Sequence, residues 1–225
     1  MNMRTVILIL LSAFGLSRAS TISITVTPDS EFTHKLIGMT MTPQMALWVE
    51  DTSGTFIATI YVTKFSWGTF GKLTPARPDA LPVWRWKGVG RGIKDANADA
   101  TSSATVRPDA STGATPKQQF TKEWIIPDSL KGRALSIYAE ANNSFDYNDT
   151  YKKKLPKDDP HYNSANGQPS LVYRGVISTA SPQLASMSLI GHGDIQGRSG
   201  AIDTRIESIT TARKIVKSIS IQVKD

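Results

Sequence analysis

Short segments in which apolar and polar residues alternate constrain the fold more than any other feature of the sequence. Residues 21–26 have the sequence Thr-Ile-Ser-Ile-Thr-Val, so every second side chain is apolar. This period of two is typical of a strand that buries one face and exposes the other. Seven further segments with strand-like composition follow: 46–50, 55–63, 119–126, 135–140, 171–177, 185–190 and 218–223.

Turn residues separate several of these segments. Residues 51–54 have the sequence Asp-Thr-Ser-Gly, and Gly132 follows Lys131 shortly before another strand-like segment. Eight short strands joined in this way predict a mainly β protein, an antiparallel immunoglobulin-like β-sandwich. Apolar residues recur at helical spacing near residues 208–216, and we expect at most one or two short helices.

Two long stretches lack the strand pattern, residues 64–118 and residues 142–170. Both exceed the usual length of a connection between strands, and connections of this length often carry function. We therefore expect a single β-sandwich domain over residues 20–225 with a long insertion at residues 64–118.

The first 19 residues have the features of a secretory signal peptide. Arg4 gives a positive start, residues 6–16 form an apolar core, and Ser-Arg-Ala at 17–19 is a small-x-small cleavage site. The apolar core is too short to span a bilayer comfortably. We expect cleavage after Ala19, export to the periplasm, and a mature chain that is not an integral membrane protein.

Composition and charge exclude several classes of function. The chain has no cysteine, which excludes disulfides and thiolate metal sites, and its three histidines lack metal-ligand spacing. The formal charge of +7 becomes +5 when Arg4 and Arg18 leave with the signal peptide. We expect no nucleic-acid partner, because the charges form no continuous run. No Gly-x-Ser-x-Gly motif of a hydrolase is present, and we expect no metal site and no catalytic residue.

One segment of the insertion specifies chemistry. Asp109, Thr112, Gly113, Ala114 and Thr115 occupy the constrained positions of an Asp-x-x-(Ser/Thr)-Gly-Ala-Thr pattern. Gly113 and Ala114 make the segment narrow and adaptable, and Thr115 supplies a hydroxyl that a base or a metal in another enzyme must activate. The alternative interpretation is an ordinary polar surface turn, which the composition explains equally well.

This pattern resembles the acceptor sequence of exported proteins to which a flavin transferase attaches FMN. The resemblance implies a phosphoester between FMN and the hydroxyl of Thr115, with the Mg²⁺ of the reaction belonging to the transferase. Better-known acceptor sequences continue with further hydroxyl residues, whereas Pro116 and Lys117 follow here.

A looser resemblance covers most of the mature chain. It is similar to a family of bacterial periplasmic proteins of unassigned function, and this similarity implies a flavin transferase and a membrane redox protein as partners. The matching segments are 45–51, 81–84, 144–148, 166–170 and 209–212, together with Phe120 and Trp124.

An isoalloxazine ring needs an apolar platform, which aromatic side chains provide by offset stacking. Trp84 and Trp86 flank Arg85, so on an extended segment both indoles point to one face. We expect these two residues, followed by Trp67, to contact the flavin. The alternative is that the indoles simply cover the sandwich.

Other residues of the insertion and the strands complete the expected site. Arg107 or Lys117 could compensate the phosphate charge, although both could equally be solvated loop charges. Trp48 and Trp124 lie within strand patterns, and we expect both in the core.

The sequence thus predicts a periplasmic electron-transfer protein with covalent FMN on Thr115. The protein itself is the substrate of the transferase, and the cofactor supplies the redox chemistry. Two alternatives remain: a flavin-free binding or structural module, and a flavoenzyme that reduces a small molecule.

Overall fold

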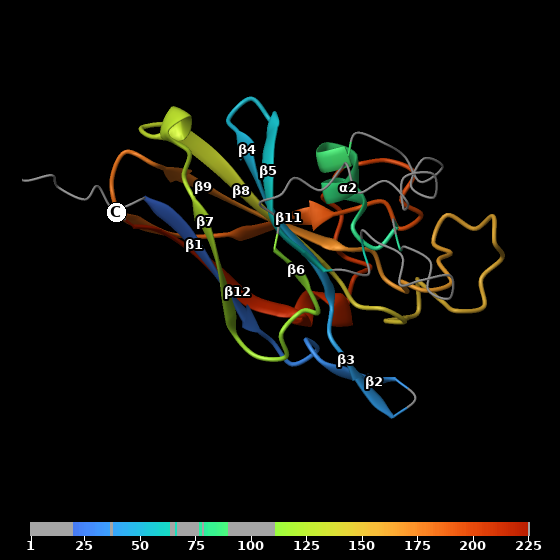
Figure 1. Ribbon diagram of the computed structural model, residues 1–225. Coiled ribbons are helices and arrows are strands. Elements are labelled where there is room, and N and C mark those ends of the chain that lie inside the picture. Colours follow the sequence, from blue (N-terminus) through green and yellow to red (C-terminus); the bar gives the residue numbers. More distant parts are fainter. Residues whose placement is uncertain are drawn as a thin grey trace, which may run out of the picture.

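The computed structural model describes residues 20–36, 38–63, 66, 77, 79–89 and 111–224 (Figure 1). The predicted signal peptide lies outside the described residues, as do Trp67, Arg107 and Asp109.

Two sheets stack face to face, which confirms the prediction of a mainly β, antiparallel sandwich (Figure 1). The smaller sheet has the order β10-β12-β1-β7 and contains β1 (Thr21–Pro28), β7 (Phe120–Ile125), β10 (Gln183–Ser186) and β12 (Val216–Lys224). The larger sheet has the order β11-β9-β8-β4-β5-β6 and contains β4 (Gln44–Asp51), β5 (Phe56–Thr63), β6 (Ser111–Gly113), β8 (Ala134–Asn142), β9 (Leu171–Ser178) and β11 (Ser188–His192).

Alternate side chains of the two sheets form the main core. Ile22, Ile24 and Val26 of β1 are fully buried, as the period of two predicts, and they belong to one cluster with Leu47 of β4 and Ile137 of β8. Burial of a single aliphatic side chain of this size contributes about 1.5 to 3 kcal/mol. Hydrophobic burial between the sheets is therefore the main stabilising term in a chain without disulfides.

The outer face of the larger sheet is also covered. Helix α2 (Pro82–Val89) lies across it, and a second apolar cluster forms between them. Trp48 of β4 and Trp84 of α2 are both buried in this cluster, and Trp48 stacks on Tyr138 of β8 at 5.1 Å. Trp124 is buried in the main core, so the expectation that Trp48 and Trp124 are core residues is confirmed.

One local prediction is wrong. Residues 185–190 do not form one strand, because the chain crosses from β10 in one sheet to β11 in the other at Met187. The helical spacing near residues 208–216 corresponds to the short 3₁₀ helix η3 (Thr211–Lys214), after which β12 begins. The insertion, in which the strand pattern is absent, contains α2 and the short strand β6.

The two ends of the sandwich differ, and we name them by their connections. At the turn end, short segments join β4 to β5, β7 to β8 through the 3₁₀ helix η2 (Asp128–Leu130), and β9 to β10. Thr21 pairs with Lys224 at this end, so the described termini lie side by side.

At the loop end, a long loop (143–170) joins β8 to β9, and a C-terminal loop (193–215) joins β11 to β12 (Figure 1). The β2 (His34–Leu36) and β3 (Met39–Met41) hairpin also projects from the chain between β1 and β4. The long connections thus gather at one end of the molecule.

Candidate functional site at the edge strand

The predicted FMN acceptor, Thr115, lies two residues after the edge strand β6. β6 pairs with β5 in parallel through three register pairs, the last of which is Thr63 with Gly113. A parallel pair requires a long crossover between its strands, and the insertion provides that length. Residues 111–115 of the motif thus lie at the open side of the larger sheet, next to the end of β5.

The Thr115 hydroxyl is part of a directed chain of hydrogen bonds. It donates to the backbone carbonyl of Pro43 at 2.7 Å, so it must accept from the Thr63 hydroxyl, which lies 2.8 Å away. The Thr63 hydroxyl in turn accepts from the backbone N–H of Met45 at 2.9 Å. Tyr61 Oη makes a longer contact with Thr115 Oγ1 of 3.4 Å. Thr115 is only 3% exposed, and its hydroxyl both donates and accepts.

Tyr61, which contacts this hydroxyl, has an aromatic ring and a cation as its own neighbours. Tyr61 contacts Phe120 of β7 with ring centroids 6.0 Å apart, and Lys122 Nζ lies 4.6 Å from the centroid of the Tyr61 ring. Lys122 alternates along β7 with the buried Phe120 and Trp124, so it shares their face, toward the space between the sheets. The acceptor threonine therefore lies beside a phenol ring that also carries a lysine ammonium over its face.

Gly113 and Ala114 are less enclosed than Thr115. Gly113 is half-buried and no atom lies within 4 Å of the position that a Cβ would take there, and Ala114 is exposed. Thr112 belongs to β6. Lys117 is exposed to solvent, whereas Arg107 and Asp109 lie outside the described residues. Within residues 113–115, Thr115 is the side chain that packs.

The expectation of an extended segment at Trp84 and Trp86 is wrong, since both lie on helix α2. Residues two apart on a helix point in nearly opposite directions. Trp84 is buried and donates its indole N–H to Thr59 Oγ1 at 3.0 Å, whereas Trp86 donates to the Gly197 carbonyl at 3.3 Å.

The structure does not bring the two indoles to Thr115. Thr59 lies four residues before Thr63 on β5, which corresponds to about 13 Å along a strand. Trp84 is bonded to Thr59, and Thr115 is bonded to Thr63. The indole of Trp84 therefore lies well away from the acceptor hydroxyl in this form of the protein.

A buried carboxyl fixes the start of helix α2. Glu140 of β8 accepts the backbone N–H groups of Val83 at 3.2 Å and Trp84 at 2.8 Å, as well as the Ser170 hydroxyl at 2.6 Å. Such a carboxyl satisfies backbone donors that have no partner within the helix. Burial raises the pKa of Glu140 to about 7, although these three donors act to lower it.

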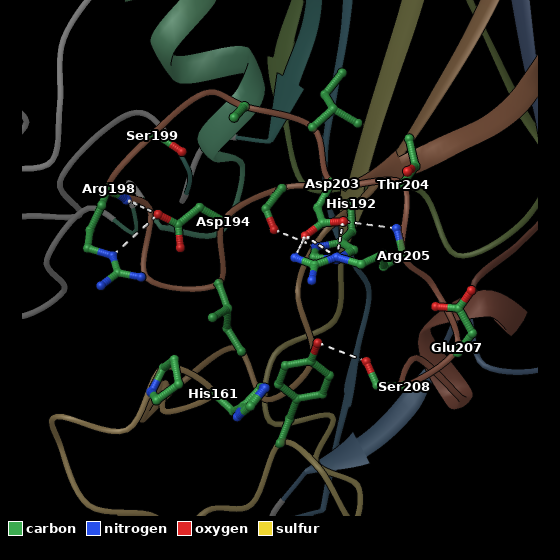
Figure 2. Close-up of a pocket in the computed structure, with 16 residues that line it drawn as sticks. His161, His192, Asp194, Arg198, Ser199, Asp203, Thr204, Arg205, Glu207 and Ser208 are labelled. Atoms are coloured by element: carbon green, nitrogen blue, oxygen red, sulfur yellow. Dashed lines mark hydrogen bonds and ion pairs between the residues drawn. The ribbon is translucent and has the colours of Figure 1, made fainter.

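A cavity of about 730 Å³ opens at the loop end, between the long loop and the C-terminal loop (Figure 2). Four of its charged side chains form two pairs within its walls. Arg198 Nε lies 3.4 Å from Asp194, and Arg205 Nε donates to Asp203 at 2.9 Å. Arg205 holds the pKa of Asp203 well below its usual range.

The cavity and the indole of Trp86 share the C-terminal loop. Trp86 bonds to Gly197, which directly precedes Arg198 in the cavity wall, and Gly200 packs against the Trp86 side chain. His192 and Tyr151 also line the cavity, and Figure 2 shows both pairs of charges facing the same hollow. This arrangement could accept a polar ligand of mixed charge.

Among the described residues, no group of three or more histidine, aspartate or glutamate side chains could hold a metal ion. No helix in that part of the chain is long and apolar enough to cross a membrane.

Sequence reasoning missed the neighbours of Thr115. Tyr61, Thr63 and Lys122 were visible only as members of strand segments, and they meet Thr115 through the pairing of β5 with β6 and the stacking of β7. The one available signal was Lys122, a charge at an inward position of the alternating segment 119–126.

Comparisons with family models, with curated proteins and with solved structures returned no match.

Proposed function

We propose that this protein is an exported electron-transfer protein that carries FMN esterified to Thr115. The observation that carries the proposal is the acceptor pattern that ends at Thr115, of which residues 111–113 form the edge strand β6. A flavin transferase is the partner that attaches the cofactor, and a membrane redox protein exchanges electrons with it. Covalent attachment suits the periplasm, where a dissociable flavin would be lost by diffusion.

The transfer reaction balances without any catalytic group of this chain. The Thr115 oxygen forms a bond to the flavin phosphorus of a donor in which that phosphate belongs to a phosphoanhydride. The anhydride P–O bond breaks, the nucleotide leaves, and the hydroxyl proton passes to a base in the transferase. The protein contributes the acceptor and the surroundings of the product.

The neighbouring strands β5 and β7 carry groups that suit a flavin phosphoester at this edge once Thr115 has left its folded position. The diester retains a negative charge, and Lys122 supplies a cation on the neighbouring Tyr61 ring. Tyr61 and Phe120 provide aromatic surface at the same edge. Lys122 therefore replaces Arg107 and Lys117 as our preferred partner for the phosphate.

The decisive experiment is the intact mass of the protein after co-expression with a flavin transferase. We expect a gain of one FMN less water and a fluorescent band that survives denaturing electrophoresis. Thr115→Ala should lose both signals completely. A wild-type chain that stays bare beside an active transferase contradicts the proposal.

A matched control separates chemistry from folding. Thr179 is another buried threonine, whose hydroxyl donates to the Leu130 carbonyl at 2.6 Å at the turn end. Thr179→Ala also removes buried hydrogen bonds, but it should keep the full flavin content. Loss of flavin in both variants would indicate misfolding instead of loss of the acceptor.

The cavity at the loop end supports a second candidate function, that of a flavin-free binding module. Its paired charges at Asp194, Arg198, Asp203 and Arg205 would recognise a small polar ligand. Protein from the native host that is colourless and has the mass of the bare chain would favour this candidate.

A further inference from the structure

The folded position of Thr115 conflicts with its modification. The hydroxyl is 3% exposed, and Pro43 O and Thr63 Oγ1 lie 2.7 and 2.8 Å from Thr115 Oγ1. A transferase must reach this oxygen along with a flavin phosphate. No such approach is open while the hydroxyl lies between these two groups.

The product also does not fit this position. A carbonyl oxygen only accepts hydrogen bonds, and an esterified threonine oxygen has no proton to donate. The phosphorus would take the place of the proton between Thr115 and Pro43, and its other oxygens would face the Pro43 carbonyl, acceptor against acceptor. The phosphate would also crowd the Thr63 hydroxyl, which lies 2.8 Å from Thr115 Oγ1.

The contacts that hold β6 are few and local. β6 is an edge strand of three residues, paired on one side only, in the parallel arrangement that is the weaker one per residue. The Cβ position of Gly113 meets nothing within 4 Å, Ala114 is exposed, and residues 117–119 after Thr115 are exposed as well. Elements with few buried contacts open locally at a small cost in free energy.

We propose that the transferase acts on β6 only after this strand has left β5, and that it takes the segment as an extended peptide. The attached flavin phosphate then prevents Thr115 from returning between Thr63 and Pro43. This inference rests on the proposed function. The closed form described here is then the unmodified form. In the modified protein, the edge of β5 that pairs with β6 would be exposed.

A reversible lock tests the proposal, because the chain has no cysteine of its own. Tyr61 and Ser111 are register partners on adjacent strands, whose spacing of about 4.8 Å lies in the range that a disulfide can bridge. Ser111 is an unconstrained position of the acceptor pattern. The double variant Tyr61→Cys with Ser111→Cys should be flavinylated at least about ten times more slowly when oxidised than when reduced.

A second disulfide controls for oxidation itself. Ser23 and Gln222 are register partners on β1 and β12 in the other sheet. The double variant Ser23→Cys with Gln222→Cys should be modified at the same rate in both redox states. Equal rates for the oxidised and reduced Tyr61/Ser111 pair would overturn the inference.

For a third variant we expect faster attachment of the flavin, an effect that general damage to the protein would not produce. Thr63→Val removes the hydroxyl that donates to Thr115, so β6 should open more often and modification should become about 5- to 10-fold faster. Thr59→Val is the matched control. Thr59 lies on the same strand as Thr63, and its substitution removes a buried hydrogen bond to Trp84 without affecting a contact of Thr115. An unchanged or slower rate in Thr63→Val, or an equal acceleration in Thr59→Val, also contradicts the inference.

The outcomes separate this inference from the proposed function. A wild-type chain that is never modified removes the flavin and the opening of β6 together. A wild-type chain that is modified while the oxidised lock has no effect removes only the opening.

Discussion

At the turn end, residues 52–55 join β4 to β5, whereas at the loop end residues 143–170 join β8 to β9. The exposed turn is held by one carboxyl, since Asp51 Oδ1 accepts the backbone N–H groups of Ser53 and Thr55 at 2.9 Å each. The long loop is held by amide side chains that are themselves buried, such as Asn166 and Gln168, each 1% exposed.

The difference shows how a chain orders a long connection without a strand ladder. Backbone polar groups that leave water must find partners. In the long loop, Asn166 donates to the Asp79 carbonyl at 2.9 Å, and Gln168 Oε1 accepts the backbone N–H of Thr210 at 2.7 Å. The loop end should therefore be sensitive to single substitutions, and the turn end tolerant of them.

The largest difference is expected between two glycines with the same backbone conformation. Gly167 in the long loop has φ +73° and Gly132 at the turn end has φ +75°. A Cβ on Gly167 would lie 2.2 Å from the Asp146 carbonyl oxygen, whereas nothing lies within 4 Å at Gly132. Gly132→Ala should cost about 1 to 2 kcal/mol, the cost of the left-handed conformation alone.

Gly167→Ala should cost about 4 kcal/mol or more, because the backbone must also move. Urea denaturation of both variants measures the difference. Equal losses for Gly167→Ala and Gly132→Ala would contradict the contrast between the two ends.

The next largest effect is a dependence of stability on pH that originates from Glu140. Its pKa is about 7 in the folded protein, against 4.5 as the ordinary value. The folded state therefore binds its proton more tightly. The stabilisation that protonated Glu140 gives is fully present below pH 4.5. It is lost as the pH rises to about 7, which lowers the free energy of unfolding by up to about 3 kcal/mol.

Glu140→Gln cannot titrate and should lack this loss. The difference in unfolding free energy between wild type and Glu140→Gln, measured at intervals from pH 4.5 to 7.5, should therefore change with pH. A constant difference would show that burial does not shift this carboxyl.

A smaller loss is expected at the amide of Asn166. Asn166→Ala removes the bonds to Asp79 and the acceptor for the partly buried Arg77 guanidinium. Leaving these groups without partners should cost about 2 to 3 kcal/mol. Ser53→Ala at the turn end is the comparison, and it should stay within about 0.5 kcal/mol of wild type. Thermal unfolding of Asn166→Ala and Ser53→Ala measures the two losses in stability.

The smallest effect is expected at the exposed ion pair of the turn end. Lys131 Nζ lies 2.8 Å from Asp128, and both side chains are in solvent. Lys131→Ala should leave the unfolding transition unchanged within error, because water screens such pairs. A clear destabilisation would mean that the turn end also depends on side-chain contacts.

The sequence predicts those strands in which the alternation of apolar and polar residues reflects one buried face. Residues 21–26 alternate because β1 has one buried face, and residues 46–50 and 135–140 lie in β4 and β8. The segment around Trp84 was misread as extended, since the Glu140 carboxyl that caps α2 comes from a strand more than fifty residues later. A cap from so far along the chain leaves no local pattern.

The candidate site was predictable only in part, for the same reason. The pattern at 109–115 identified Thr115 as the residue of interest, but its burial depends on Thr63, Tyr61 and Pro43, which local sequence does not link to it. The order of the long loop was also not predictable, because in the sequence its buried asparagine and glutamine residues look the same as those of a solvated loop.

The side-by-side termini, where Thr21 pairs with Lys224, have a practical consequence. A tether fused to either β1 or β12 leaves the molecule from the turn end and points the opposite end outward. Immobilised on an electrode through such a tether, the protein would present its cavity and its long loops to an incoming reaction partner.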